Sequence, residues 1–387
     1  MSRFYSYINT AKIILSGYHG DRPFALYLKE FFKQHNKHGS TDRKQIAHLC
    51  YCFFRLGQAG RNVETDQRLI SALFLCSTTP NKILSGIAPL LNDAVHLSLD
   101  KKLDRIEFPL SAEDIFPWKN DLSAGIDLNA FALSHLQQPD LFLRIRPGFE
   151  EVIEKKLAAA NITFNPFSEH CLSLDNALKV DDLIELDKEA VVQDFNSQRV
   201  GELVQFVVKE QPQKIWDCCA ASGGKSILMH DLFPAAKLTV SDIRKSILIN
   251  LAKRFQQAGI TKYRSIVADL TNSKLPITNS SFDLIVCDAP CTGSGTWSRT
   301  PEQLYFFDKK KIDYYSNLQQ KISGEASRYL KQGGYFLYIT CSVFKKENED
   351  VIKILQNEAG LKLIRMELLK GYDKKADTLF AALLQKQ

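Results

Sequence analysis

The chain has 387 residues, of which 45% are hydrophobic and 24% charged, and its formal net charge is +6. This length and apolar content suffice for two or three domains with buried cores, as in a soluble globular protein that needs no disulfides or metals to fold. The positive charge permits a nucleic-acid partner without requiring one.

The nine cysteines are an odd number scattered over a long chain, which excludes a disulfide framework and indicates free thiols. Cys50/Cys52 and Cys218/Cys219 lack the two-residue spacing of tetrahedral zinc sites, so no metal is expected. The first twenty residues contain neither a continuous apolar run nor a cleavage pattern. We therefore expect no secretory signal and no membrane span, and a cytoplasmic location.

Apolar residues recur at helical spacing from Phe4 to about Gln138, as in RPFALYLKEFF and RKQIAHLCYCFFRL. Helix-start residues from Ser40 to Asp42 and several later prolines predict a set of short helices, forming a helical domain over residues 1–135. Residues 136–190 combine strand patterns in LFLRIRP, ITFNPF, CLSLDN and LIELD with a helical pattern in FEEVIEKKLAAAN. This pattern predicts a small α/β insert.

Strand and helix patterns alternate from residue 191 to residue 387. The strand-like runs are KIWDCCA, KLTVSDI, RSIVADL, FDLIVCDAP and YFLYITCS. Alternating strands and helices predict a mostly parallel, doubly wound sheet, in which ligands bind outside the carboxyl ends of the strands. The Gly-, Ser- and Thr-rich stretch over residues 292–301 follows one strand end and is a candidate active-site loop.

A glycine turn, ASGGKS, follows the first of these strands. Gly223 and Gly224 allow close approach of the backbone to a ligand, and the helix that follows offers free amide donors to a nucleotide-like molecule. GKS also occurs in phosphate-binding loops, but Cys219 stands where that motif needs glycine. A nucleotide triphosphatase is therefore the weaker interpretation of this turn.

Three successive strands end in carboxylates, Asp242, Asp269 and Asp288. Without clustered histidines, they suit the recognition of hydroxyl and amino groups better than metal binding. Asp242 stands where an acidic residue accepts ribose hydroxyls, although a structural role is an open alternative.

Two cysteines follow the ends of their strands, Cys291 in DAPCTGSG and Cys341 in YITCS, and are expected to face one pocket. Cys76, Cys171 and Cys287 are instead expected to be buried packing residues. A thiolate that adds to carbon 6 of a pyrimidine makes carbon 5 nucleophilic, so the exposed pair suits covalent catalysis on a pyrimidine.

Together, DCCAASGGKS, DAPCTGSG and ITCS resemble the Sun-type (NOL/NOP/SUN, RsmB-like) family of RNA cytosine-5 methyltransferases. The resemblance is best from about Val191 to Phe344. The insert is similar in type to the family's small RNA-binding subdomain, and STDRKQIAHLCYCFFRLGQ resembles the NusB-type helical domain of its bacterial branch. The implied fold is α/β: a doubly wound Rossmann-like methyltransferase domain with an all-helical N-terminal domain and a small α/β insert.

The resemblance implies methyl transfer from S-adenosylmethionine to carbon 5 of a cytosine in RNA, by family branch ribosomal RNA. It makes Cys341 the nucleophile at carbon 6 of the base. It implies that Cys291 promotes release of the enzyme from the RNA after methyl transfer. It assigns Asp242 to the cofactor's ribose, Asp269 to its adenine, and Asp288 with Lys225 to the base, Asp288 also touching the cofactor. The cofactor's methionine end is implied to lie against Cys219, Ala220, Ala221, Ser222, Gly223, Gly224 and Lys225.

The chain departs from the family pattern at Ser222, where a proline is usual, and in its last segment, which lacks an expected glycine and aromatic pair. The target cytosine is expected to be unpaired or flipped, held by aromatics near Trp297 and by basic residues. In the alternative interpretation, the three lysines among these residues form a solvated charge run. These basic residues are Arg299, Lys309, Lys310 and Lys311.

Two other functions stay open from the sequence. One is a methyltransferase acting on a small molecule, a protein or DNA, and the other is a non-catalytic RNA-binding assembly factor. No membrane partner is expected, and a monomer is favoured although the sequence does not define the oligomeric state.

Overall fold

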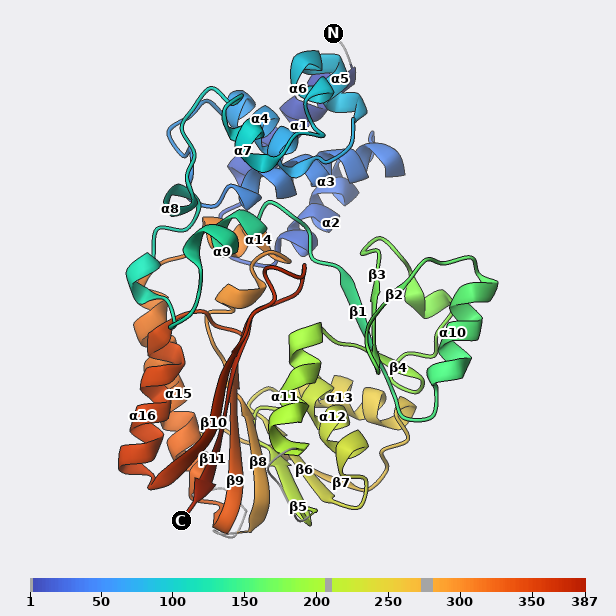
Figure 1. The fold of residues 1–387 in the computed structure, drawn as a ribbon. Coiled ribbons are helices and arrows are strands. Elements are labelled where there is room, and N and C mark those ends of the chain that lie inside the picture. The colour runs from blue at the N-terminus through green and yellow to red at the C-terminus, as the bar shows by residue number, and fades with distance from the viewer. Residues whose placement is uncertain (1–2, 206–210, 273–280) are drawn as a thin grey trace. The chain divides into compact units, whose positions relative to one another are not determined.

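A computed structural model describes residues 3–205, 211–272 and 281–387 (Figure 1). The chain divides into two compact units. We call residues 1–120, 127–138 and 297–309 the helical unit, and residues 121–126, 139–296 and 310–387 the sheet unit. The boundaries expected near residues 135 and 190 stay predictions. Within the described ranges, no helix has the length and apolar character needed to cross a membrane.

The described residues of the helical unit form helices and no strand, as the apolar spacing predicts. Arg55 at the end of α3 is buried and donates hydrogen bonds to the carbonyl oxygens of His135 (2.8 Å) and Ser298 (3.0 Å), which ties three separate segments together. The helices are α1 (Arg3–Gly17), α2 (Phe24–Gln34), α3 (Ser40–Arg55), α4 (Thr65–Cys76), α5 (Lys82–Ile87), α6 (Pro89–Asp93), α7 (Leu99–Leu103), α8 (Ala112–Ile115), α9 (Leu128–Ser134) and α14 (Pro301–Tyr305).

The small α/β part of the sheet unit is a four-stranded antiparallel sheet in the order β2-β3-β1-β4 with one α-helix and one 3-10 helix. The expected strand over Leu183–Asp187 is wrong. This segment follows a 3-10 helix and enters a turn in which Asp187 has a φ of 65° and Glu189 N–H bonds the Glu185 carbonyl at 2.8 Å. The elements are β1 (Leu141–Ile145), α10 (Glu150–Ala159), β2 (Asn165–Ser168), β3 (Cys171–Leu174), η2 (Val180–Asp182) and β4 (Ala190–Val192).

A seven-stranded sheet, in the order β10-β11-β9-β8-β5-β6-β7, forms the rest of the sheet unit. The strands from β9 to β7 are parallel, and β11 runs antiparallel between β9 and β10. The strands are β5 (Lys214–Asp217), β6 (Lys237–Asp242), β7 (Tyr263–Val267), β8 (Phe282–Asp288), β9 (Leu330–Thr340), β10 (Leu361–Leu369) and β11 (Leu379–Lys386). The main helices are α11 (Phe195–Gln205), α12 (Gly224–Leu232), α13 (Lys245–Gln257), α15 (Lys310–Ser327) and α16 (Glu349–Glu358).

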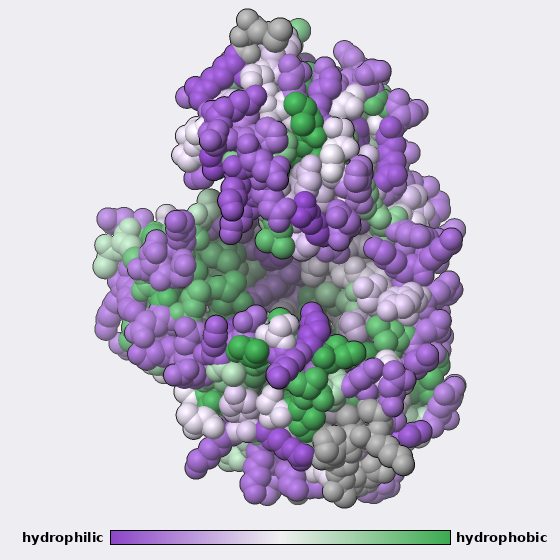
Figure 2. Space-filling model, turned by 180° about the vertical axis from the view of Figure 1, so that it is seen from behind, coloured by the Kyte–Doolittle hydropathy of each residue, from purple (hydrophilic) through white to green (hydrophobic). Residues whose placement is uncertain are grey.

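Both faces of this sheet are buried, because alternate strand residues join different apolar clusters. Ile215 packs with residues of α11, α12 and α13, whereas its neighbour Trp216 packs with residues of α15 and α16 (Figure 1). Hydrophilic side chains cover most of the face shown in Figure 2. The predicted doubly wound α/β fold is confirmed, and the carboxyl ends of its parallel strands share one edge.

Candidate active site

The glycine turn lies between the end of β5 and the start of α12. Ala221 has a φ of 45° and Gly223 a φ of 89°. A Cβ on Gly223 would meet Phe255 at 2.9 Å and Leu251 at 3.1 Å, so both conformation and space require glycine there. A Cβ on Gly224 would meet nothing within 4 Å. Because the first amides of α12 have no acceptor inside the helix, the turn presents donors beside open space.

Asp242 lies at the end of β6 and is tied to this turn. Its Oδ2 accepts the Ala221 N–H at 3.1 Å, and its Oδ1 accepts the backbone N–H of Arg244 at 2.9 Å and the Nε–H of the same arginine at 3.0 Å. The Arg244 side chain is 60% exposed and so has room to move away from the carboxylate. Asp242 therefore lies against the turn, and an arginine binds its carboxylate. Its assignment to the cofactor's ribose stays a prediction.

Asp269 follows β7, the strand that pairs with β6. Its carboxylate accepts the N–H of Thr271 at 2.8 Å and the hydroxyl of Thr271 at 2.7 Å. These hydrogen bonds lower the pKa of Asp269, and the bond from the Thr271 hydroxyl has the larger effect. Asp269 is thus held at the same edge of the sheet as Asp242.

Lys225 and Asp288, which the resemblance assigns to the base, form an ion pair with each other. Lys225 Nζ lies 3.1 Å from Asp288 Oδ2 and donates to Ser197 Oγ at 2.6 Å. The Asp288 side chain is 33% exposed, whereas that of Lys225 is only 10% exposed. Ser197, on α11, was missed; its position in the VVQDFNSQRV lead-in was the signal that could have found it.

Cys291 and Cys341 follow β8 and β9, and their Sγ atoms lie 3.2 Å apart. Neither forms a disulfide, and each is partly accessible. The hydrogen bond with Cys341, and then burial, hold the pKa of Cys291 well above its ordinary value. Cys291 therefore remains a thiol that can donate toward the sulfur of Cys341.

Asp217 at the end of β5 is a further strand-end carboxylate that the sequence analysis did not single out. It is fully buried, and burial raises its pKa to about 7 although Ser226 Oγ donates to it at 2.6 Å. Its place in WDCC, directly before the glycine turn, could have identified it.

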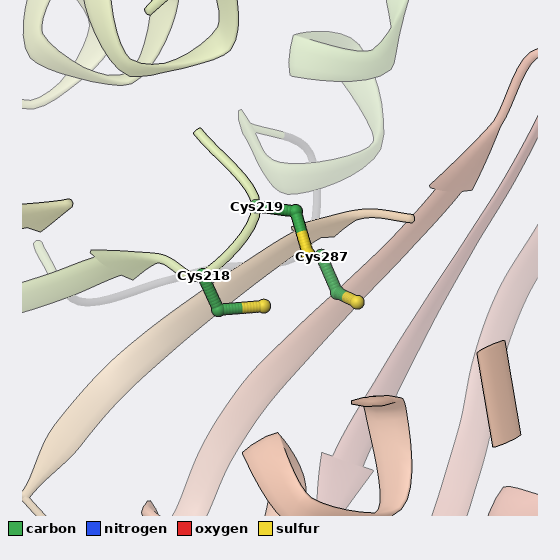
Figure 3. A group of neighbouring side chains, drawn as sticks. All are labelled: Cys218, Cys219 and Cys287. Carbon is green, nitrogen blue, oxygen red and sulfur yellow. The ribbon is translucent and has the colours of Figure 1, made fainter. Parts of the chain in front are cut away.

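A group of three thiols lies beside the turn. The Sγ atoms of Cys218, Cys219 and Cys287 are all within 4.8 Å of one another (Figure 3). Cys218 and Cys287 are buried, so the prediction of buried packing for Cys287 is confirmed, as it is for Cys171. Cys76 is only partly buried. The prediction that the chain holds no metal stays a prediction.

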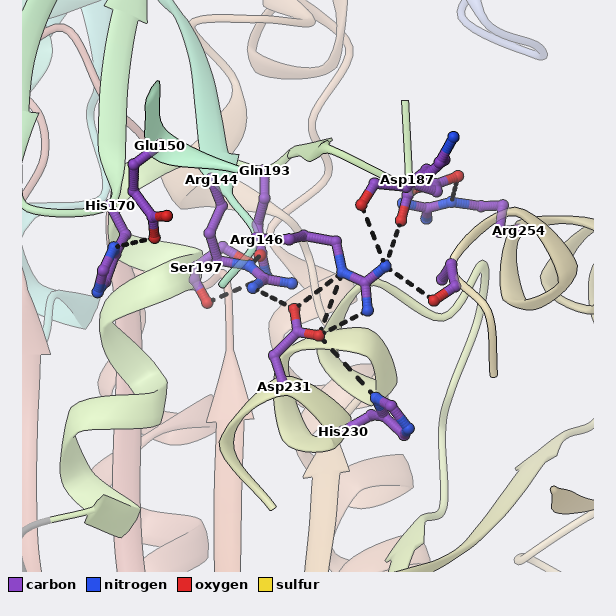
Figure 4. A network of polar contacts seen from close by, with 12 residues as sticks. Arg144, Arg146, Glu150, His170, Asp187, Gln193, Ser197, His230, Asp231 and Arg254 are labelled. Atoms are coloured by element: carbon purple, nitrogen blue, oxygen red, sulfur yellow. Dashed lines mark hydrogen bonds and ion pairs between the residues drawn. The ribbon is translucent and has the colours of Figure 1, made fainter. Parts of the chain in front are cut away.

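A network of ion pairs connects the small α/β part to the glycine turn (Figure 4). Arg146, directly after β1, donates to the Asp187 carbonyl oxygen at 2.9 Å and to Asp231 at 2.7 Å. The Asp187 carboxylate accepts two hydrogen bonds from Arg254 of α13, at 2.8 and 2.6 Å. Arg254 also donates to the carbonyl oxygen (3.0 Å) and hydroxyl (3.1 Å) of Ser222. The residue that departs from the family pattern is therefore held by an arginine.

Trp297 does not have the accessibility that base stacking requires. It is 1% exposed and packs inside the helical unit, with its ring centroid 4.6 Å from that of Phe307 and 6.1 Å from those of Phe116 and Trp118. The prediction that aromatics around Trp297 hold the base is therefore wrong for Trp297. RNA binding by Arg299, Lys309, Lys310 and Lys311 stays a prediction.

A family model described as 16S rRNA methyltransferase RsmB/F matches residues 204–382. The ribosomal RNA small subunit methyltransferase B of Xylella fastidiosa (strain 9a5c) is 29% identical over 219 residues, covering 55% of this chain and 51% of that protein. The human tRNA (cytosine(72)-C(5))-methyltransferase NSUN6 is 32% identical over 163 residues, covering 39% and 34% respectively. The match to this chain thus spans about half the length of the Xylella fastidiosa protein and about a third of human NSUN6.

Among solved structures, PH0851 has a TM-score of 0.69 at 21% identity and covers 98% of this chain and 97% of its own. NSun6 from Pyrococcus horikoshii with SFG has a TM-score of 0.57 at 14% identity and covers 71% and 96%. These two likenesses show the fold. By sequence, residues 204–382 are similar to the RsmB/F methyltransferases, and the two curated relatives are RNA methyltransferases by name.

Proposed function

We propose that this protein transfers a methyl group from S-adenosylmethionine to carbon 5 of a cytosine in RNA, with ribosomal RNA as the substrate class. The observation that carries the proposal is the contact of two thiols, Cys291 and Cys341, 3.2 Å apart at adjoining strand ends. The Lys225–Asp288 pair lies at the end of the same strand β8. The names of the curated relatives support RNA as the acceptor.

The residues around the glycine turn fit this cofactor. The left-handed Gly223, the open space at Gly224 and the amides of α12 suit the carboxylate of its methionine end. Asp242 would hold the ribose once Arg244 releases its carboxylate, and Asp269 the adenine. Ile243, which is 60% exposed directly after Asp242, offers apolar surface to the adenine ring. When bound, S-adenosylmethionine supplies an electrophilic methyl group.

The protein's part in the reaction is to activate and then release the base. The Cys341 thiolate adds to carbon 6, and the electron pair displaced from the ring double bond makes carbon 5 nucleophilic. Asp288 and Lys225 bind the polar edge of the base and stabilise the activated ring. After carbon 5 has gained its methyl group, its proton passes to water and Cys341 departs with its bonding electrons, which restores the ring double bond. We assign Cys291 to this release.

The proposal is tested with tritiated S-adenosylmethionine and total RNA from a strain lacking the gene, followed by nucleoside analysis. Wild-type protein is expected to produce labelled 5-methylcytidine, and Cys341→Ala none. Cys291→Ala is expected to accumulate a protein–RNA adduct that survives denaturing gels. Absence of that adduct from an otherwise active system would make Cys291 a structural residue.

Two other functions have distinct outcomes in the same assay. Label in protein, DNA or a small molecule instead of RNA would indicate another acceptor. Cofactor binding with no label in any fraction would indicate a non-catalytic assembly factor.

A further inference from the structure

Glu347 has no role in the reaction as described so far, yet it is the hub of the loops that carry the two thiols. It ends the 3-10 helix η4 (Lys345–Glu347), and its side chain is fully buried. Its carboxylate accepts four hydrogen bonds. Oε1 accepts the hydroxyls of Thr292 (2.6 Å) and Ser342 (2.7 Å). Oε2 accepts the Thr292 N–H (2.9 Å) and the amide Nε2–H of Gln319 (2.9 Å).

The two hydroxyl donors are the residues that directly follow the two thiols. Thr292 comes after Cys291, and Ser342 after Cys341. One carboxylate oxygen therefore fixes both loops at the position next to each sulfur. Further hydrogen bonds between the loops support this arrangement: Gly295 N–H to the Cys341 carbonyl (2.8 Å) and Val343 N–H to Ser294 Oγ (2.9 Å). The Ser342 hydroxyl also lies 3.3 Å from the hydroxyls of Thr292 and Ser294.

The chemistry of the site demands a carboxylate. All four bonds to Glu347 come from donors, and an ionised carboxylate offers acceptor sites on both oxygens. A glutamine would keep the Oε1 contacts but would turn its own NH2 toward the N–H of Thr292 and the amide of Gln319. Buried donors left facing another donor are costly, so packing alone does not explain an acidic residue here.

The backbone around Glu347 is fixed from two more sides. Tyr338 donates its hydroxyl to the Glu347 carbonyl oxygen at 2.7 Å. The next residue, Asn348, accepts the Thr340 hydroxyl at 2.5 Å and donates to the Ser342 carbonyl oxygen at 2.9 Å. The backbone at Glu347 is therefore fixed, and its carboxylate holds both loops in place.

We propose that Glu347 is a positioning residue that holds Cys291 and Cys341 in the relation needed for attack on the base and for its release. The proposal rests on the proposed function for its chemical meaning. Its geometric content, that Glu347 fixes the distance between the two sulfurs, is independent of any substrate.

The geometric content is tested by oxidation with diamide, which takes two protons and two electrons from a pair of thiols and joins nearby ones as a disulfide. In wild type, peptide mapping should find a rapidly formed Cys291–Cys341 bond. Glu347→Gln is expected to slow its formation about tenfold, because the new NH2 group would face the Thr292 N–H and displace the loop that carries Cys291. Glu358→Gln, an equal charge change at an exposed position, should match wild type. Equal rates in all three proteins would overturn the proposal.

The catalytic content is tested by turnover and by the covalent adduct. Glu347→Gln should lower kcat about 100-fold with cofactor affinity unchanged, because misplacing a reacting atom by about 1 Å costs that much. The double variant Cys291→Ala/Glu347→Gln should accumulate less RNA adduct than Cys291→Ala alone. An undiminished adduct together with wild-type kcat would refute a positioning role.

The two proposals fail in different ways. If Cys291→Ala forms no adduct with any RNA but diamide trapping still depends on Glu347, the proposed function fails while the geometric role stands. If Glu347→Gln does not fold well enough to bind cofactor, Thr292→Val carries the test, because it removes one hydroxyl and keeps shape and the backbone bond. It should slow trapping and lower kcat in the same direction, and a wild-type result would overturn the proposal.

Discussion

Lys225 Nζ lies 3.1 Å from Asp288 Oδ2 and is held there by a second hydrogen bond to Ser197. The lysine comes from the glycine turn that we assign to the cofactor, and the aspartate from the strand end that precedes Cys291. One ion pair therefore spans the cofactor side and the base side of the proposed site.

Lys225→Met should lower kcat/KM by about 100-fold, because a charged donor aimed at the reacting base contributes about 3 kcal/mol to its activation. Steady-state methylation of RNA measures the effect. Lys253→Met, on the exposed side of α13, serves as the matched control and should be fully active. Equal activity of the two variants would remove Lys225 from the reaction.

The stability of the protein should depend on pH through Asp217. Its pKa is about 7 in the folded protein against an ordinary 3.8, so the folded state retains a proton that the unfolded state releases. This contribution is complete below pH 3.8 and is lost as the pH rises to about 7. The loss amounts to at most about 4 kcal/mol. Urea unfolding between pH 5 and 8 should show a steeper decline for wild type than for Asp217→Asn, and parallel curves would contradict the assignment.

Gly295→Ala should damage the Cys341 loop. A Cβ on Gly295 would lie 1.9 Å from the Thr378 carbonyl oxygen and 3.1 Å from that of Cys341, so the backbone must shift. We expect a loss of about 2 kcal/mol in the free energy of unfolding. Gly324→Ala is the control, since it lies within α15 with nothing within 4 Å of the new Cβ, and it should gain about 0.5 to 1 kcal/mol. Calorimetric melting of both variants measures the contrast, and a stable Gly295→Ala would show that the loop can move.

Arg254→Met should weaken both the fold and cofactor binding. It leaves the Asp187 carboxylate, which is 9% exposed, without its two-bond partner and frees Ser222 in the glycine turn. The expected loss is about 2 to 3 kcal/mol in the free energy of unfolding. Arg328→Met removes a pair whose arginine side chain is 70% exposed, and it should change stability by less than about 0.5 kcal/mol. In the double variant Asp187→Asn/Arg254→Met the losses should not add, and additive losses would mean that the pair does not interact.

Much of the sheet and of the site was predictable because both follow from short-range patterns. Apolar runs marked the parallel strands, and the residue after each run marked the ligand-binding edge. The sequence alone therefore identified three features of this edge: the glycine turn, the strand-end carboxylates and the two thiols.

The errors have a common physical origin in contacts between distant residues. Glu347 sits in KKENED, which has the composition of a solvated charge run, and only its donors from distant segments show that it is buried. The segment LIELD has the pattern of a strand but enters a turn, which a hydrogen bond between Glu189 N–H and the Glu185 carbonyl closes. Trp297 lies in a polar, glycine-rich segment and was expected near the base, yet it packs with Phe307 in an aromatic cluster.

The helical unit is completed by residues that are synthesised long after its first helices. Tyr305, at the end of α14, packs against Phe53 and Phe54 of α3, with ring centroids 5.6 and 5.4 Å apart. Gln58 donates to the carbonyl oxygens of Leu304 and Tyr305. On the ribosome, this part of the core stays open until residue 309 has been made. A fragment ending near residue 135 would lack these contacts and leave that side of Phe53 and Phe54 uncovered by α14.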